Sequence, residues 1–600
     1  MKKSSLKKRQ TAARKNKKVY YGGTNYVPPT NTGDWIQYNQ EIVNDSNPEP
    51  IDYTDAIDTS KISNDIITSS IKIAQGPKFV EGTKYRIILD TDPGCDDSLF
   101  IATCIASVLF LKSQKIDIEI CGITIVHGNN QNVDILTRAA ARILYECGQI
   151  LVDDKGDCMF PSLPLKCALS QDFELVMGND KKLNCEKPSN AGTFVHGPEG
   201  LGLLSNSDNP PTSSDIPENE NNNAIEKKNP FNKIDKYTNS KVDAIMAANK
   251  IVIKGNKASE FIKKKLLEKP ENTKISILAV GPLTNIGQMI QDAATDVPPY
   301  LDTLNANLTE IVIMGGSVGI GNTAPLVEAN WMNDPKAVDL CLKHLNTKIT
   351  WVPLNFTHQL NIRRVVKYFK ELKKEGDKHD LFNLFENIFK RYIDALTGKI
   401  VKEVLPFASM VLFDTTIGYT EYVDDTKGPF PFACALNTPL EWKKLKKRPD
   451  LTDIFPNGIQ KNGLPLHDGS AMLAFFYPEL IEFKQRSIKI DTAQTTFGWG
   501  GPKEEVAGLV TMAITEPEPA ELLYEVKMAY QPKTSDTIDH NAAVEHIHQL
   551  FVSLIRYLNN IRQAPVPPIA SGGGGSRSSK KRKSPKKTRK TRKYRKKYMR

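Results

Sequence analysis

Short apolar runs alternate with stretches of helical spacing through the middle of the chain. Parallel sheets of this kind are built from buried strands linked by helices, so the alternation predicts an α/β fold with an open, mostly parallel, Rossmann-like sheet and helices on both faces. In such sheets ligands bind beyond the carboxyl ends of the strands, where we expect the polar motifs to gather. The expected strands are 85–90, 116–126, 275–280, 311–314 and 349–354, and the expected helices are 98–111, 133–146, 242–253 and 283–291.

Two segments interrupt this alternation. Residues 204–229 are rich in Asn, Ser, Asp and Pro, which predicts a disordered surface insertion. Residues 361–465 mix Lys-rich helical pieces with Pro/Gly loops, which predicts an enlarged cap insertion beside the site. We therefore expect one domain over residues 84–560 that carries both insertions.

Both ends of the chain are basic, whereas the rest is acidic. Residues 1–18 hold nine Lys/Arg and residues 571–600 hold fifteen, with no acid in either segment. Removing these 24 positive charges from the net charge of +11 leaves −13 for the remainder. We expect residues 1–83 to form a basic arm and a mostly irregular extension with a short helix near 64–73. Residues 561–600 are expected to form a flexible linker and a basic tail.

The tails predict contacts with nucleic acid. Unopposed Lys and Arg bind polyphosphate chains by counterion release, without sequence specificity. Residues 580–587 also resemble a nuclear localisation signal. Nine scattered cysteines without a C-x-x-C pair favour free thiols in a reducing intracellular compartment, with cytoplasm, nucleus and virion all compatible. We expect no membrane span, because the longest apolar run, 101–111, has 11 residues and a spanning helix needs about 18.

An acidic loop follows the first expected strand. Asp90, Asp92, Asp96 and Asp97 lie within eight residues, with no basic residue among them. Gathered at a strand end, these carboxylates would repel one another and raise each other's pKa unless a cation neutralised them. Their hard oxygen atoms suit Ca²⁺ or Mg²⁺. A solvated turn that caps the following helix is the alternative, and the loop alone does not separate the two.

Seven motifs in order link the chain to a known family. The segment from Leu89 to Asp97 resembles the N-terminal signature of the inosine–uridine-preferring nucleoside hydrolases, and the resemblance covers about residues 84–560. It implies an enzyme, commonly a homo-oligomer, that hydrolyses the N-glycosidic bond of ribonucleosides to ribose and free base. The other motifs are Val126–Asn129, His196–Gly202, Ala279–Asn285, the segment from Met314 to Pro335, Asn355–Gln359 and Leu466–Asp468.

The resemblance also implies roles for individual residues. The side chains of Asp92, Asp97 and Asp468 and the main-chain carbonyl of Val280 would hold Ca²⁺. Asp92 would also act as the general base toward water, and His467 and His196 would assist the departing base. The remaining substrate contacts would be Asp96, Asn129 and Asn330 at the ribose hydroxyls, Asn322 and Glu328 at the 5′ end, and Met314 beneath the sugar.

Other interpretations of these residues stay open at this stage. The asparagines can cap turns, Met314 can be a core residue, and His127 and His358 are expected to be structural. Phe389, Tyr392 and the region around Trp499 are candidates for stacking on the base, although no motif covers them. Residues 315–319 also fit the G-x-S-x-G pattern of a hydrolase, but a loop-like sequence follows instead of a helix, which favours a ribose-binding turn.

A competing function is a noncatalytic riboside-binding or scaffold protein on the same fold, tethered to nucleic acid by its basic tails. An idle site would be expected to have lost at least one of Asp92, Asp97 or Asp468. All three are present, so the complete set favours the enzyme.

Overall fold

The computed structural model describes most of the expected α/β domain. The described residues up to Arg562 belong to one compact unit. The insertion expected at 204–229, most of the cap expected at 361–465 and both basic tails lie outside the described residues. The described residues are 57–72, 78–149, 151–152, 158–159, 167–183, 196, 200–201, 252–255, 257–318, 322, 327–345, 348–377, 380–396, 465–490, 492, 495–497, 504–506, 510–512 and 523–563.

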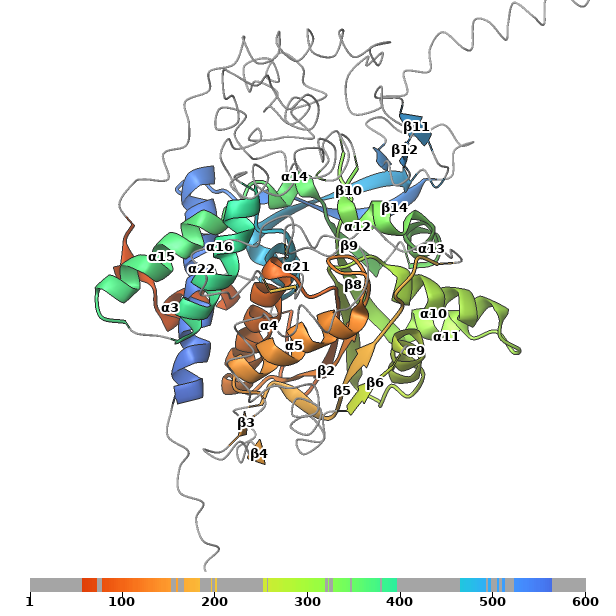
Figure 1. Cartoon of the computed structure of the whole chain (residues 1–600), viewed down its shortest axis with the longest axis horizontal. Coiled ribbons are helices and arrows are strands. Elements are labelled where there is room, and N and C mark those ends of the chain that lie inside the picture. Colours follow the sequence, from red (N-terminus) through yellow and green to blue (C-terminus); the bar gives the residue numbers. More distant parts are fainter. Residues whose placement is uncertain are drawn as a thin grey trace, which may run out of the picture. The chain divides into compact units, whose positions relative to one another are not determined.

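A ten-stranded sheet forms the centre of this unit (Figure 1). The strands from β14 to β6 in the order below are parallel to their neighbours, and β10 pairs antiparallel with both β14 and β13. In sheet order they are β13 (Val510–Met512), β10 (Ile481–Ile490), β14 (Tyr524–Pro532), β9 (Ile349–Val352), β8 (Leu308–Met314), β7 (Thr273–Ala279), β1 (Lys84–Thr91), β2 (Asp117–Ile125), β5 (Leu169–Met177) and β6 (Val252–Lys254). Two small antiparallel pairs are β3 (Leu151–Val152) with β4 (Cys158–Met159), and β11 (Thr495–Phe497) with β12 (Glu504–Val506).

Helices cover both faces of this sheet, as the sequence predicts (Figure 1). One group of helices packs around α4, α5 and α21, and another around α9, α10, α11 and α13. No helix in the described residues is both long and apolar enough to cross a membrane. The helices are η1 (Thr59–Lys61), α3 (Asn64–Lys72), α4 (Cys95–Ser113), α5 (Val133–Glu146), α9 (Ala258–Leu267), α10 (Thr284–Thr295), α11 (Leu301–Asn307), α12 (Ala329–Asn333), α13 (Pro335–Leu345), α14 (Leu354–Thr357), α15 (Ile362–Lys374), α16 (Asp380–Leu396), α21 (His467–Phe476), η8 (Pro478–Leu480) and α22 (His540–Gln563).

The chain order of the strands creates a switch point beside β1. The chain runs outward from β1 through β2, β5 and β6, then returns to β7 on the other side of β1 and continues outward through β8 and β9. Loops after β1 and β7 therefore leave the sheet toward opposite faces, and ligand sites form where such loops part.

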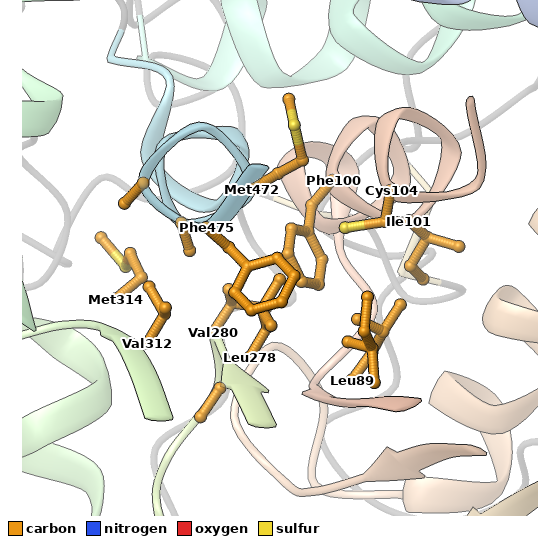
Figure 2. Close-up of a cluster of buried hydrophobic side chains, with 14 of the residues drawn as sticks. Leu89, Phe100, Ile101, Cys104, Leu278, Val280, Val312, Met314, Met472 and Phe475 are labelled. Atoms are coloured by element: carbon orange, nitrogen blue, oxygen red, sulfur yellow. The ribbon is translucent and has the colours of Figure 1, made fainter. Parts of the chain in front are cut away.

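The core beneath this switch point explains why α4 and α21 are apolar all round. Both helices are buried along their length, since they pack on the sheet and on each other. Figure 2 shows Phe100 and Cys104 of α4 beside Met472 and Phe475 of α21. Leu89, Leu278 and Val312 face them from the strands, with Val280 and Met314 in the same cluster. The two helices that begin with aspartates are thus fixed by one shared core.

Segments near both ends of the folded unit also pack on this core. Lys78 Nζ donates to the Phe475 carbonyl oxygen (2.8 Å) and pairs with Glu310 (2.6 Å). The Phe79 ring lies 5.7 Å from that of Phe475. At the other end of the chain, His548 Nε2 on α22 accepts from the Asn361 main-chain N–H (2.9 Å). Residues before β1 and after β14 therefore belong to the same folded body.

Most of the expected elements are confirmed, and two are wrong in part. The short helix expected near 64–73 is α3, and the helix expected at 133–146 is α5. The helix expected at 242–253 is wrong at its end, because Val252 and Ile253 form the edge strand β6; its earlier residues lie outside the described part. A three-residue strand shows too little alternation to be told from a helix end. The strand expected at 349–354 ends at Val352, and Leu354 begins α14.

Candidate active site

The carboxyl ends of four adjacent strands carry the residues singled out in the sequence. Asp92 follows β1, Asn129 follows β2, Val280 follows β7, and Met314 ends β8. Because parallel strands end at the same edge, these residues meet above the switch point. Asp468 reaches the same place from the first turn of α21.

Asp97 organises the turn between β1 and α4. Its Oδ2 accepts from the Gly94 main-chain N–H (2.8 Å) and from Asn129 Nδ2 (3.0 Å), and its Oδ1 accepts from the Thr91 hydroxyl. This is a helix cap, so the structural role weighed in the sequence is present. A side chain at position 94 would not fit, because a Cβ there would lie 2.4 Å from His196 Nδ1 and 2.5 Å from Asn129 Nδ2.

Asp92 lies at the centre of the loop and is buried. Its Oδ2 accepts from the Asn129 main-chain N–H (2.8 Å), and its main-chain carbonyl accepts from Asn129 Nδ2 (2.8 Å). Gly128 and Gly281 leave room for the carboxylate, since a Cβ at either would lie within 2.7 Å of one of its oxygens. Burial, and then the charge of Asp97, raise the pKa of Asp92 well above its usual range.

Asp96 and Asp468 complete a cluster of buried carboxyl groups. One oxygen from each of Asp96, Asp97 and Asp468 lies within 4.8 Å of the other two. Burial raises the pKa of all three, and that of Asp96 reaches about 7. Burial and the neighbouring charges of Asp96, Asp97 and Asp92 all raise the pKa of Asp468. No lysine or arginine pairs with the cluster within the described residues.

The donor set of this cluster fits a hard divalent cation. Ligand oxygens lie about 2.3–2.6 Å from Ca²⁺, so oxygens on opposite sides of one ion are about 5 Å apart, close to the observed spacing. Asp96 Oδ1 is buried and accepts no hydrogen bond within the described part of the chain, so it has an oxygen to offer. The cluster can therefore hold a metal ion. Asp92, expected among the ligands, is not one of these three residues, and its role as a ligand stays a prediction.

Asn330 connects the ends of β7 and β8. Its Nδ2 donates to the Val280 carbonyl oxygen (2.6 Å) and lies 3.7 Å from Met314 Sδ. The same carbonyl was expected to bind the metal, and a carbonyl oxygen has a second lone pair available for that. Met314 is 2% exposed, so its core role is established, while its contact with the sugar stays a prediction.

Glu328 and Asn322 shape the turn on which Asn330 is placed. Glu328 caps α12: its Oε1 accepts from the Asn330 N–H (2.8 Å), and its Oε2 accepts from the N–H groups of Gly316 (2.8 Å) and Trp331 (3.0 Å). Asn322 Oδ1 accepts from the Ala329 N–H (2.9 Å). The structure brings both residues to the site, and their binding of the 5′ end stays a prediction.

Two histidines flank the carboxylates. His196 Nδ1 accepts from the Cys95 main-chain N–H (2.9 Å) and lies 3.7 Å from Asp96 Oδ1. The neutral ring therefore carries its proton on Nε2. His467 Nδ1 lies 2.8 Å from the Thr357 hydroxyl, and its ring is 5.6 Å from that of His358.

Tyr392 links the two histidine segments. Its ring lies 5.9 Å from that of His196, and its hydroxyl lies 3.5 Å from the carbonyl oxygen of Pro465, which precedes the His467 motif. Phe389, another aromatic candidate, packs 6.3 Å from Tyr392 on the same helix and is fully buried. The third candidate, Trp499, lies outside the described residues. Of the two described candidates, Tyr392 is thus the one that reaches a site histidine.

Several residues that shape the site were not predicted from the sequence. Trp331 stacks on Trp351 (5.4 Å between ring centroids), and Trp351 Nε1 donates to the Gly315 carbonyl oxygen (2.7 Å). Asn285 Nδ2 donates to Asp90 Oδ1 (2.8 Å), and burial raises the pKa of Asp90 to about 7. The motif Ala279–Asn285 contains Asn285, but its sequence does not say which strand its side chain will reach.

Comparison with known proteins agrees with this geometry. The family model described as inosine-uridine preferring nucleoside hydrolase matches residues 87–505. The chain therefore belongs to the inosine-uridine preferring nucleoside hydrolase family, which confirms the resemblance found in the motifs.

Individual relatives are distant. Uridine nucleosidase 1 of Arabidopsis thaliana is 28% identical over 284 residues, which is 47% of this chain and 60% of the relative. The inosine-uridine preferring nucleoside hydrolase of Leishmania major is 25% identical over 343 residues, 56% of this chain and 82% of the relative. A solved purine-preferring ribonucleoside hydrolase from Gardnerella vaginalis aligns at a TM-score of 0.44 and 16% identity, covering 78% of this chain and 99% of that one.

Proposed function

We propose that the protein hydrolyses the N-glycosidic bond of ribonucleosides, releasing ribose and the free base, and that it uses Ca²⁺. One observation carries the proposal: buried carboxyl groups that have no lysine or arginine partner within the described residues converge beside Asn129 and Asn330 at the carboxyl edge of a parallel sheet. Burying carboxyl groups that repel one another costs free energy of folding unless a bound cation compensates for it.

The proposed ligands of the ion are Asp92, Asp97, Asp468 and the Val280 carbonyl, with Asp96 close enough to take part. Carboxylate and carbonyl oxygens favour Ca²⁺, which accepts six to eight oxygen ligands in flexible geometry. When bound, Ca²⁺ supplies a Lewis acid that orients water and lowers its pKa.

Asp92 is proposed as the general base. Water adds its oxygen to C1′ as the bond from C1′ to the base nitrogen breaks, and the water proton passes to the Asp92 carboxylate. The Asn129 N–H holds one oxygen of that carboxylate in place. Burial of Asp92 raises its affinity for a proton, which suits a base. The amides of Asn129 and Asn330, with Asp96, are proposed to bind the ribose hydroxyls.

His196 and His467 are proposed to assist the leaving base. Neutral His196 carries its proton on Nε2, because Nδ1 accepts from Cys95, and that N–H can donate to a departing nitrogen or oxygen. His467 is adjacent to Asp468 and anchored by Thr357, so its imidazole stays beside the cluster. Either histidine can lower the barrier by neutralising charge on the base as it leaves.

The test is ribose release by the full chain from inosine, uridine, adenosine, guanosine and cytidine, with and without a calcium chelator. The expected result is release that the chelator abolishes and added Ca²⁺ restores. Asp92→Asn should lose about 10²–10⁴-fold in kcat. Release from none of the five by folded, calcium-bound protein would contradict the proposal and favour the riboside-binding scaffold.

The charge of the tails supports a second, separable activity. Fifteen Lys/Arg without an acid in residues 571–600 favour binding of nucleic acid by counterion release. We propose that the tail tethers the enzyme, itself a homo-oligomer, to nucleic acid. Affinity for duplex DNA should fall steeply with salt and be lost on deletion of 571–600, whereas Asp92→Asn should leave it unchanged. Salt-independent binding would contradict the tether.

A further inference from the structure

Three buried polar side chains, His127, Thr284 and Asp334, are joined in a chain by hydrogen bonds and come from segments that carry proposed ribose or metal contacts. His127 Nε2 lies 3.0 Å from the Thr284 hydroxyl oxygen, and that hydroxyl donates to Asp334 Oδ2 (2.7 Å). His127 is 0% exposed, and Thr284 and Asp334 are each 1% exposed. The sequence marks His127 only as an expected structural residue.

The direction of each bond in this chain is fixed by its donors. Asp334 acts as an acceptor throughout, because its Oδ2 also accepts from the Leu183 N–H (2.7 Å) and its Oδ1 accepts from the Ala337 N–H (3.1 Å). The single hydroxyl proton of Thr284 is therefore committed to Asp334. Thr284 can only accept from His127, so His127 is the neutral tautomer with its proton on Nε2. Thr284 is the one residue that both donates and accepts in this chain.

Each member lies a few residues from a proposed ribose or metal contact. His127 precedes Asn129 by two positions at the end of β2. Thr284 begins α10 four positions after Val280, and Asp334 follows Asn330 by four positions beyond α12. The hydrogen bonds among His127, Thr284 and Asp334 thus join the three segments, far apart in sequence, that carry Asn129, Val280 and Asn330.

The other contacts of the three residues add to this linkage. The His127 main-chain N–H donates to the Asn179 carbonyl oxygen (3.1 Å), and the Asn179 N–H donates to Asn285 Oδ1 (3.1 Å). His127 Nδ1 is buried without a hydrogen-bond partner within the described residues, so the ring is oriented on its polar side by Thr284. Removing that bond leaves the imidazole with no polar anchor, and a shift there moves the backbone that leads to Asn129.

We propose that Asp334, Thr284 and His127 form a positioning relay that sets the spacing of Asn129, Val280 and Asn330, and through it the preference for a ribose with both hydroxyls. The inference rests on the proposed function. These are positioning residues, because none of them is placed against the substrate. Their effect follows from geometry, since small displacements of groups that bind the sugar cost much of the rate.

Thr284→Val and Thr284→Ser test the relay in the full chain. Valine keeps the shape but removes both hydrogen bonds, whereas serine keeps the hydroxyl. The readouts are kcat/KM for uridine or inosine, the ratio of that value to the one for the matching 2′-deoxynucleoside, and the affinity for free ribose by calorimetry. Thr284→Val should lose at least tenfold in kcat/KM for the ribonucleoside and in ribose affinity, with a smaller loss for the deoxynucleoside. Thr284→Ser should stay within about threefold of wild type on every readout.

The outcomes separate the relay from the reaction. Equal losses of Thr284→Val on the ribonucleoside and the deoxynucleoside, or a Thr284→Ser variant that fails as badly, would indicate general loss of structure and overturn the relay. Wild-type protein that binds ribose but cleaves no nucleoside would refute the hydrolase, while a Thr284→Val loss in ribose affinity would still support the relay. Wild-type protein that neither binds ribose nor cleaves a nucleoside would overturn both.

Discussion

The side-chain amide of Asn330 donates a 2.6 Å hydrogen bond to the main-chain carbonyl of Val280. Asn330 comes from the turn after β8 and Val280 from the end of β7, so the bond fixes two neighbouring strand ends at the point where the metal and the ribose are proposed to bind.

Asn330→Ala should lower kcat/KM about 10–100-fold, because it removes an amide proposed to bind a ribose hydroxyl and frees the Val280 carbonyl. Asn307→Ala is a matched control, since Asn307 Nδ2 donates to the Leu266 carbonyl (2.9 Å) away from the site. The control should cost about 1 kcal/mol of unfolding free energy without changing kcat/KM. Steady-state kinetics and urea unfolding of both variants check this. Equal kinetic losses in the two would remove Asn330 from the substrate site.

Asp468→Asn should stabilise the metal-free protein and abolish its stabilisation by calcium. The buried carboxyl groups of Asp96, Asp97 and Asp92 repel the charge of Asp468. Removing that charge should therefore raise the free energy of unfolding without calcium by on the order of 1–2 kcal/mol. The free energy of unfolding of the wild type should rise by about 2.7 kcal/mol at a calcium concentration of 100 times Kd, and that of the variant should not. Unfolding curves with chelator and with calcium measure both the stabilisation by the substitution and the stabilisation by calcium. Asp302→Asn on the exposed surface of α11 should change neither; a destabilised metal-free Asp468→Asn would show that the cluster needs no cation.

Gly316→Ala should destabilise the protein more than Gly376→Ala. Both glycines have a positive φ, +66° and +97°, so each substitution carries a backbone cost of about 1 kcal/mol. A Cβ at 316 would also lie 2.6 Å from the Trp331 ring, whereas a Cβ at 376 meets nothing within 4 Å. The extra loss at 316 should be at least about 1–3 kcal/mol in urea unfolding. Equal losses would mean that the Trp331 ring moves freely, and the turn that holds Glu328 is not rigid.

His540→Gln should reduce acid destabilisation. Burial lowers the pKa of His540 from 6.5 to about 4, so between these values the unfolded chain binds a proton that the folded chain does not. Stability from this group is complete above pH 6.5 and is lost as the pH falls toward 4, by at most about 3 kcal/mol. Thermal unfolding of both proteins from pH 7.5 to 4.5, in saturating calcium, measures the difference. If the stability of both proteins falls equally between pH 7.5 and 4.5, groups other than His540 cause the acid sensitivity.

The sequence predicted the site residues better than the residues that hold them in place. Asp92, Asn129 and Val280 follow apolar runs that any parallel sheet would align, so their meeting at one edge follows from the pattern alone. The Trp331–Trp351 stack and the Thr284 hydroxyl depend on contacts across strands, which no local pattern encodes. β5 was missed because polar residues interrupt it, and β6 was taken for the end of a helix because it is only three residues long.

Lys78 and Phe79 pack on the end of α21, and His548 of α22 accepts from Asn361. The family model matches residues 87–505, whereas the folded unit includes residues on both sides of that range. A fragment trimmed to residues 87–505 would lose the contacts of Lys78 and Phe79 with Phe475, the His548 acceptor of the Asn361 N–H, and the strand β14. The helix α21, which begins with His467 and Asp468, is therefore packed partly against residues outside the segment that the family model matches.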